Sequence, residues 1–149
     1  MKEDPGRVLG VDPGEKRIGL ALSDPSQTIA SPLEIIEHRS RQEAAQLIIK
    51  KAEEKEVVLI LLGFADDWDG KTSYQAKRSL RLKDELIASG NIPVMLWSEY
   101  GSTKKAQTAR RMMNTSRKKR TGHLDDLAAT VILQSFLDSR LDVELDENQ

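Results

Sequence analysis

Residues 7–24 constrain the fold more than any other part of the chain, because they predict two short strands joined by a tight turn. Residues 8–11 are nearly all apolar, which is typical of a strand buried on both faces. Pro13 and Gly14 form the turn, since proline fixes its own φ and glycine accepts a positive φ. Asp12 ends the first strand. A carboxylate there either bonds its own backbone in the turn or is compensated by a cation or a metal ion.

The rest of the chain alternates apolar strands with amphipathic helices. Ser40 followed by Glu43 is a capping-box pattern and marks the start of the first helix. Residues 57–63 form a continuous apolar run that is too short for a buried helix and suits a central parallel strand. We also expect a third strand at 27–36 and a later one at 94–99, a polar loop at 115–122, and helices at 40–56, 72–89, 102–114 and 124–137.

This order of elements predicts an α/β fold, a ribonuclease H-like mixed five-stranded sheet flanked by helices, with right-handed crossovers between the later strands. At 149 residues the chain is long enough for one domain with its own core. We place that domain at residues 1–141. Residues 142–149 are acidic and poor in apolar side chains, and we expect them to form a disordered tail.

Composition excludes several classes of protein. The chain contains no cysteine, so disulfides and thiolate metal sites are ruled out and a reducing compartment is expected. No apolar run approaches membrane-spanning length, and the N-terminus does not resemble a signal peptide. These features predict a cytoplasmic protein. No stretch of the sequence has the pattern of a subunit interface, so we expect a monomer or a weak homodimer.

The net charge of −1 hides a strong segregation of charge. Residues 101–123 contain eight basic side chains and no acidic one. A basic surface of this kind suits a polyanion, so nucleic acid is the expected partner. The eight basic residues are Lys104, Lys105, Arg110, Arg111, Arg117, Lys118, Lys119 and Arg120.

Three carboxylates stand where the predicted elements can bring them together. Asp12 and Glu99 each end a strand, and parallel strands deliver their carboxyl ends to one edge of a sheet. The third is Asp125 or Asp126, at the start of the last helix. At about 100° per residue, the apolar positions of that helix form one arc with Asp125 inside it and Asp126 at its edge. That arc comprises Leu124, Ala128, Ala129, Val131, Ile132 and Phe136.

Three converging carboxylates favour hard cations that prefer oxygen ligands, such as Mg²⁺ or Mn²⁺. Two such ions about 4 Å apart can activate a water and stabilise the leaving oxygen of a phosphodiester. Alternatively, the three acids belong to separate surface salt bridges, and a helix N-terminus accepts any carboxylate.

Four segments together resemble the YqgF family, also called RuvX. Residues 11–24 are similar to its opening motif, and residues 63–70 to its second, glycine-led motif. Residues 98–103 stand where the family has Asp-Glu-Arg-Leu and two hydroxyl residues, and residues 123–133 resemble its closing helix. The resemblance implies a ribonuclease H-like nuclease that matures the 5′ end of the small-subunit ribosomal RNA precursor, with Holliday junction resolution as the older proposal.

The resemblance also assigns roles to residues. It places the catalytic acids at Asp12, Glu99 and Asp125. Because these acids converge, we also expect them to bind the metal. From their positive charge, we expect Lys16, Arg17 and the eight basic residues of 101–123 to bind the substrate. The chain departs from the family pattern at Ser98, Ala65 and Tyr100, which replace Asp, Pro and Arg. Losing that Arg removes a bidentate donor for phosphate or an orienting partner for Glu99.

Two other functions fit parts of the sequence. One is a nucleic-acid-binding protein of the same fold that retains the acids but cuts little. The other is an ATPase of the actin and sugar-kinase type, whose phosphate loop also has the Asp-x-Gly pattern and a later Gly, as in Asp12, Gly14 and Gly19. That group needs two such domains around one nucleotide, and this chain holds one.

Overall fold

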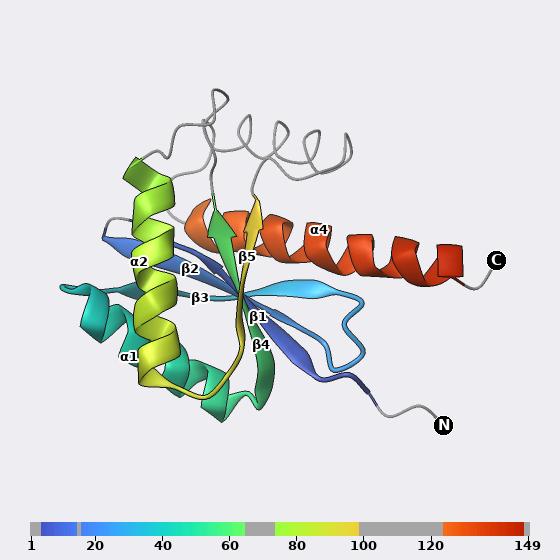
Figure 1. The fold of residues 1–149 in the computed structure, drawn as a ribbon, viewed down its shortest axis with the longest axis horizontal. Coiled ribbons are helices and arrows are strands. Elements are labelled where there is room, and N and C mark those ends of the chain that lie inside the picture. The colour runs from blue at the N-terminus through green and yellow to red at the C-terminus, as the bar shows by residue number, and fades with distance from the viewer. Residues whose placement is uncertain (1–3, 15, 65–73, 99–123, 148–149) are drawn as a thin grey trace.

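The computed structural model describes residues 4–14, 16–64, 74–98 and 124–147 (Figure 1). The predicted order of strands and helices along the chain is confirmed over these residues. In chain order the elements are β1 (Arg7–Asp12), β2 (Arg17–Ser23), β3 (Ala30–Glu37), α1 (Arg41–Glu54), β4 (Val57–Phe64), α2 (Tyr74–Ser89), β5 (Val94–Ser98) and α4 (Leu124–Glu147).

The five strands form one mixed sheet, as predicted, and their order in the sheet is β3-β2-β1-β4-β5. β1 pairs antiparallel with β2, and β2 antiparallel with β3, which makes the first three strands a meander. β4 pairs parallel with β1 on one side and with β5 on the other. The carboxyl ends of β1, β4 and β5 therefore lie at the same edge of the sheet, and the turn between β1 and β2 lies there too.

Two hydrophobic cores cover the two faces of this sheet. On one face, Leu9, Val11, Ile60 and Leu62 pack with residues of α1 and α2. On the other face, alternate strand residues pack with α4. We call these the α1/α2 face and the α4 face. The residues of the α4 face are Val8, Ala21, Leu61, Ala129, Ile132, Leu133, Phe136 and Leu137, with Trp97 packed against them.

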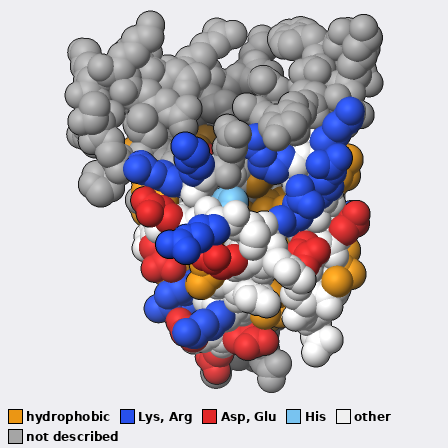
Figure 2. Space-filling model, turned by 90° about the vertical axis from the view of Figure 1, so that its left-hand side faces the viewer, with side chains coloured by type: hydrophobic (Ala, Val, Ile, Leu, Met, Phe, Trp, Pro, Cys, Tyr) orange, Lys and Arg blue, Asp and Glu red, His pale blue; other side chains and the backbone are white. Residues whose placement is uncertain are grey.

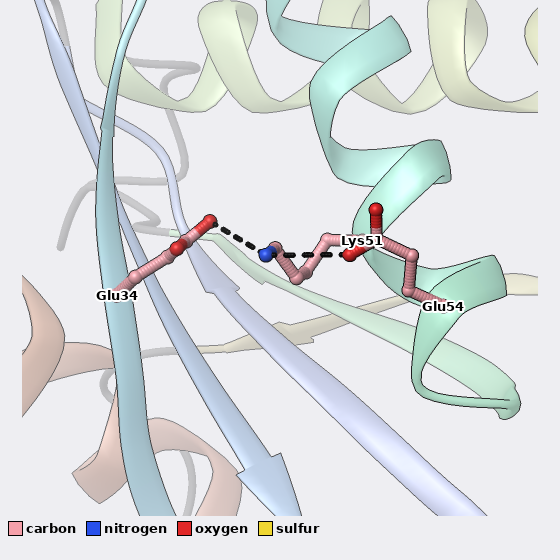
Figure 3. A network of polar contacts seen from close by, with 3 residues as sticks. All are labelled: Glu34, Lys51 and Glu54. Carbon is pink, nitrogen blue, oxygen red and sulfur yellow. Dashed lines mark ion pairs between the residues drawn. The ribbon is translucent and has the colours of Figure 1, made fainter.

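Helix α1 begins as the sequence predicted. The Ser40 hydroxyl accepts a hydrogen bond from the Glu43 backbone N–H at 3.1 Å, which satisfies one of the first-turn amides. Further along the helix, the Lys51 ammonium lies 3.4 Å from a carboxylate oxygen of Glu34 on β3 and 3.5 Å from one of Glu54 (Figure 3). The two carboxylates, Glu34 first, raise the pKa of Lys51. The contact between the half-buried Lys51 and Glu34 links α1 to the edge strand of the sheet.

Two predicted boundaries were wrong. Strand β3 begins at Ala30, not at residue 27, because Gln27 has a φ of 59° and belongs to a turn that the Asp24 carboxylate stabilises. Helix α4 continues to Glu147 instead of ending near residue 137, because the Arg140 guanidinium stacks 5.5 Å from the Phe136 ring and reaches Gln27. Residues 142–147 continue this helix. The disordered tail and the division of the chain at residue 141 stay predictions.

Within the described part of the chain, no helix has both the length and the apolar character needed to cross a membrane.

Candidate active site

Asp12 is the one predicted catalytic acid whose side chain the structure describes. It is the last residue of β1 and is half-buried. Side chains alternate along a strand: Leu9 and Val11 face α1 and α2, whereas Val8 faces α4. Gly10 also faces α4, since a Cβ built on it would lie 2.9 Å from Leu133 Cβ. Asp12 therefore belongs to the α4 face. It lies two positions after Gly10, where β1 and α4 approach each other closely.

The direction of α4 brings its first turn to the same edge as Asp12. The Gln134 side chain bonds Ala30 N–H and the Thr28 carbonyl, and Arg140 bonds Gln27, which itself bonds Gly6 just before β1. The later turns of α4 thus lie toward the amino end of β1. The helix rises about 1.5 Å per residue, so ten residues back from Gln134 its start lies about 15 Å toward the carboxyl end of β1. Figure 1 shows the start of α4 at that end of the sheet.

The helix geometry does not separate Asp125 from Asp126 as the sequence predicted. Leu133 and Leu137 are fully buried, whereas Ala128 and Val131 are only half-buried, so the buried face is turned away from the predicted arc. At about 100° per residue, positions 125 and 126 stand on either side of its centre, about 50° away each. The side chains of both lie outside the described residues. The choice of Asp125 rests on the family resemblance alone.

Glu99 lies outside the described residues, but the strand that precedes it is well defined. Trp97 packs on the α4 face, with its ring edge-on to Phe136 at 5.3 Å and its indole N–H donating to the Ser135 hydroxyl at 2.8 Å. Strand β5 runs parallel to β4, and β4 to β1. Its carboxyl end therefore lies at the edge that holds Asp12. The segments containing Ala65 and Tyr100 also lie outside the described residues.

The turn after Asp12 needs Gly14 for a different reason from the predicted one. The φ of Gly14 is not in the left-handed region; instead, a Cβ at this position would lie 2.1 Å from the Arg17 carbonyl oxygen. Close approach of the two backbone segments therefore excludes a side chain. The sequence identified the residue correctly, but the backbone path that makes it necessary becomes visible only in the structure.

Two of the predicted substrate-binding residues are described. Lys16 is exposed on the turn between β1 and β2, at the same edge as Asp12. Arg17 is exposed at the start of β2, and its Nε lies 3.6 Å from Glu37 Oε1. The other eight basic residues, from Lys104 to Arg120, lie outside the described residues. So do most of the expected metal ligands, and among the residues described here no three His, Asp or Glu side chains gather to hold a metal. Asp12 contributes one carboxylate at an edge where the chain offers only oxygen and imidazole donors, which fits a hard cation.

Sequence reasoning missed the structural role of Ser23 and Asp24, which close the opening motif. The Ser23 hydroxyl accepts a hydrogen bond from the buried Val8 N–H at 2.8 Å. The Asp24 carboxylate accepts from Thr28 N–H and Ile29 N–H at 2.8 and 2.9 Å and from the Ser26 hydroxyl. These bonds, led by that from Ile29, lower the pKa of Asp24 to about 2. Asp24 followed by Pro and Ser, with Thr four positions on, was the signal, since this pattern is typical of a side-chain-stabilised turn.

The comparisons with known proteins agree with this geometry. A family model described as "RuvX: Holliday junction resolvase" matches residues 6–139. Two similar proteins are both named "Putative pre-16S rRNA nuclease". The one from Roseiflexus sp. is 34% identical over 140 residues, which cover 94% of this chain and 99% of that protein. The one from Thermoanaerobacter pseudethanolicus is 36% identical over 135 residues, covering 90% and 97%.

Solved structures with the same fold share much less sequence. "T. thermophilus RuvC in complex with Holliday junction substrate" has a TM-score of 0.59 at 15% identity and covers 92% of this chain and 96% of that one. The large terminase nuclease from thermophilic phage G20c has a TM-score of 0.57 at 13% identity, covering 87% and 81%. These likenesses confirm the predicted ribonuclease H-like fold. With the family model matching nearly the whole chain and relatives above 30% identity, the chain belongs to the RuvX family.

Proposed function

We propose that this protein is a metal-dependent nuclease that hydrolyses phosphodiester bonds in structured nucleic acid, with the 5′ end of pre-16S ribosomal RNA as its substrate. The observation that carries the proposal is the position of Asp12. Its carboxylate ends β1 on the α4 face, at the edge where the start of α4 and the carboxyl end of β5 also lie. The names of the relatives support the choice of substrate.

Three acids of the chain would hold the metal: Asp12, Glu99 and Asp125. Glu99 follows β5 directly, two positions after Trp97, whose ring packs on the α4 face. Asp125 stands in the first turn of α4. A bound Mg²⁺ or Mn²⁺ supplies a nucleophilic water at neutral pH and stabilises the charge on the leaving oxygen. Strand β1 and helix α4 fix the carboxylates in place, so that the protein does not reorganise during the reaction.

The substrate would lie across the carboxyl edge of the sheet. Lys16 and Arg17 are exposed on that edge, and the basic run from Lys104 to Arg120 follows Glu99 in the sequence. Cationic side chains there bind phosphates and release counterions, which makes binding depend steeply on salt. Tyr100, in place of the family's Arg, offers phosphate at best one hydroxyl. A ribosomal RNA precursor as substrate places the protein in the cytoplasm, where it acts as a monomer or weak homodimer.

The test is cleavage of a labelled pre-16S RNA fragment by the purified protein with Mg²⁺ or Mn²⁺. Asp12→Asn retains the shape of the side chain and removes its charge, and we expect cleavage to fall by about a hundredfold or more. The matched control is Asp24→Asn, which changes the other Asp of the opening motif. We expect the control to cleave at the wild-type rate, because Asp24 stabilises a turn at the amino end of β1. Full activity of Asp12→Asn would refute the proposal.

The same assay settles the third acid. Asp125→Asn and Asp126→Asn are compared side by side, because the two positions lie equally far from the centre of the buried face of α4. The proposal expects loss of cleavage in the first variant only. If Asp126→Asn is the inactive variant, Asp126 is the third metal ligand, and the assignment of Asp125 from the family is wrong by one position.

Holliday junction resolution is the second candidate, supported by the description of the family model that matches residues 6–139. A four-way DNA junction in the same assay distinguishes the two functions. Resolution predicts paired, symmetric cuts and a rate that rises with protein concentration, because two active sites must act on one junction. Cleavage of the RNA alone supports the ribosomal substrate.

A further inference from the structure

A pocket with a volume of 220 Å³ opens beside the candidate active site, on the α1/α2 face of the sheet. It starts one residue after Asp12, at Pro13 and Gly14, and reaches the start of α1 and the first half of α2. Its floor is aliphatic, from Ile18, Ala44 and Leu82. Its polar lining is His38, Arg39, Ser40, Arg41 and Arg78.

Positive charge dominates this pocket. Three arginines line it, from the β3–α1 connection, from α1 and from α2, and no carboxylate of the described residues does. The ion pairs between described residues are Arg17 with Glu37 and Lys51 with Glu34 and Glu54, and none of them involves Arg39 or Arg41. Figure 2 faces this part of the molecule and shows Lys and Arg side chains gathered around it. The guanidinium groups of Arg39 and Arg41 therefore suit an anion, above all phosphate.

Two further groups point to the same ligand. Helix α1 is 14 residues long, and its N-terminus at Ser40 and Arg41 lines the pocket, so its first-turn N–H groups and dipole add partial positive charge. The His38 ring has its Nε2 3.4 Å from the Gly14 carbonyl oxygen, while its buried Nδ1 has no hydrogen-bond partner among the described residues. A buried ring nitrogen without a partner costs free energy unless a ligand or water satisfies it.

We propose that this pocket binds a phosphate of the nucleic-acid backbone next to the phosphodiester at Asp12. The pocket and Asp12 lie on opposite faces of the sheet but at the same edge, joined by Pro13 and Gly14. A strand that passes over this edge presents successive phosphates to both. The pocket then positions the substrate and takes no part in the chemistry. That the phosphate belongs to a nucleic acid depends on the proposed nuclease function. That the pocket binds an anion depends only on the residues that line it.

The experiment measures binding without cleavage. The full chain carrying Asp12→Asn binds a labelled pre-16S RNA fragment across a salt series. Adding Arg39→Ala and Arg41→Ala should weaken binding about tenfold at low salt and flatten the slope of log affinity against log salt by about 0.7 for each phosphate that is no longer neutralised. The matched control replaces Lys50 and Lys55, exposed at the far end of α1, by Ala. It removes the same charge and should leave both quantities nearly unchanged.

A second measurement separates the two sources of phosphate. Inorganic phosphate and a nucleoside monophosphate are titrated into the protein, and the backbone amides of Gly14, Ser40 and Arg41 are followed by NMR. If both small ligands bind weakly at these amides and compete with the RNA, the result supports a site for a backbone phosphate. Tight binding of the nucleoside monophosphate, with RNA affinity unchanged by the two arginine substitutions, would overturn it in favour of a free nucleotide. Equal salt slopes for the arginine pair and the lysine pair would also overturn it.

These outcomes do not depend on whether the protein cleaves. If the wild-type chain binds RNA through the pocket but never cleaves it, the nuclease proposal fails and the phosphate site stands. If it cleaves while the arginine pair changes neither affinity nor salt slope, the phosphate site fails alone.

Discussion

The two faces of the sheet are held by different kinds of contact. The α1/α2 face is closed by aliphatic side chains of four strands and two helices, and its ion pairs lie at the margin. The α4 face has one helix, and polar bonds fix that helix in the middle of its packed stretch, from Gln134 to the β2–β3 turn and the start of β3 and from Ser135 to Trp97. Aliphatic packing tolerates small shifts, whereas directional bonds set one position along the helix. The face that carries Asp12 is therefore the one whose geometry is specified.

The largest effect on stability should come from the aliphatic face. Ile48 on α1 is fully buried, and Ile48→Ala should lower the free energy of unfolding by about 2–5 kcal/mol through the cavity that it leaves. Urea denaturation measures this loss. The folded variant should cleave at the wild-type rate, because α1 does not position the acids. A lower rate in the fully folded protein would mean that the two faces are not independent.

Gly10→Ala tests the close crossing of β1 and α4. The added Cβ would lie 2.9 Å from Leu133 Cβ and 3.2 Å from the Ala129 carbonyl oxygen, so the helix must move away from the strand. We expect a loss of about 1–3 kcal/mol in stability. We also expect cleavage to fall more than in Ile48→Ala, although the loss of stability is smaller. Wild-type activity of the Gly10→Ala variant would show that cleavage does not depend on the placement of α4 over β1.

Asp24→Ala removes the acceptor that closes the β2–β3 turn and should cost about 1–2 kcal/mol at neutral pH. The pKa of Asp24 is about 2 in the folded protein, below its ordinary value of 3.8. The carboxylate therefore stabilises the fold fully above pH 4, and this contribution disappears as the pH falls toward 2. Unfolding measured from pH 7 to pH 2 should show wild type and variant converging in acid. A constant difference would assign the effect to packing instead.

Ser135→Ala tests the polar fixation of α4 directly. The indole N–H of Trp97 loses its acceptor, and we expect a cost of about 1 kcal/mol in stability. Ser139→Ala is the matched control, since its hydroxyl bonds the helix backbone at Phe136 and reaches no strand. Equal changes in stability for the two variants would argue against a role of the Trp97 bond in fixing the helix.

Lys51→Gln should have the smallest effect. The half-buried Lys51 side chain pairs with Glu34 and Glu54, two exposed carboxylates at the surface, where salt screens the attraction (Figure 3). The loss of stability should be smaller than that of Ser135→Ala and should vanish in about 1 M NaCl. A loss that persists at high salt would indicate packing by the lysine stem.

Local signals allowed much of the fold to be predicted. The capping box at Ser40, the apolar run of β4 and the strand that ends in Asp12 each depend on neighbouring residues, and each is confirmed. Parallel pairing then follows from the crossovers, so the shared edge of Asp12 and the end of β5 was also predictable. The boundaries of β3 and α4 were not, because contacts of Asp24, Gln27 and Arg140 with distant residues set them.

Sequence by itself determined that Asp12 ends a buried strand and that a helix near the C-terminus contains further acids. Which side of that helix is buried was decided only by the tertiary structure. Helix α4 has apolar residues around much of its circumference, so its periodicity does not select a face. The selection comes from Gly10, whose missing side chain admits Leu133 and Ala129 against β1. Packing between residues more than a hundred positions apart fixed the rotation of α4, and no local pattern contains that information.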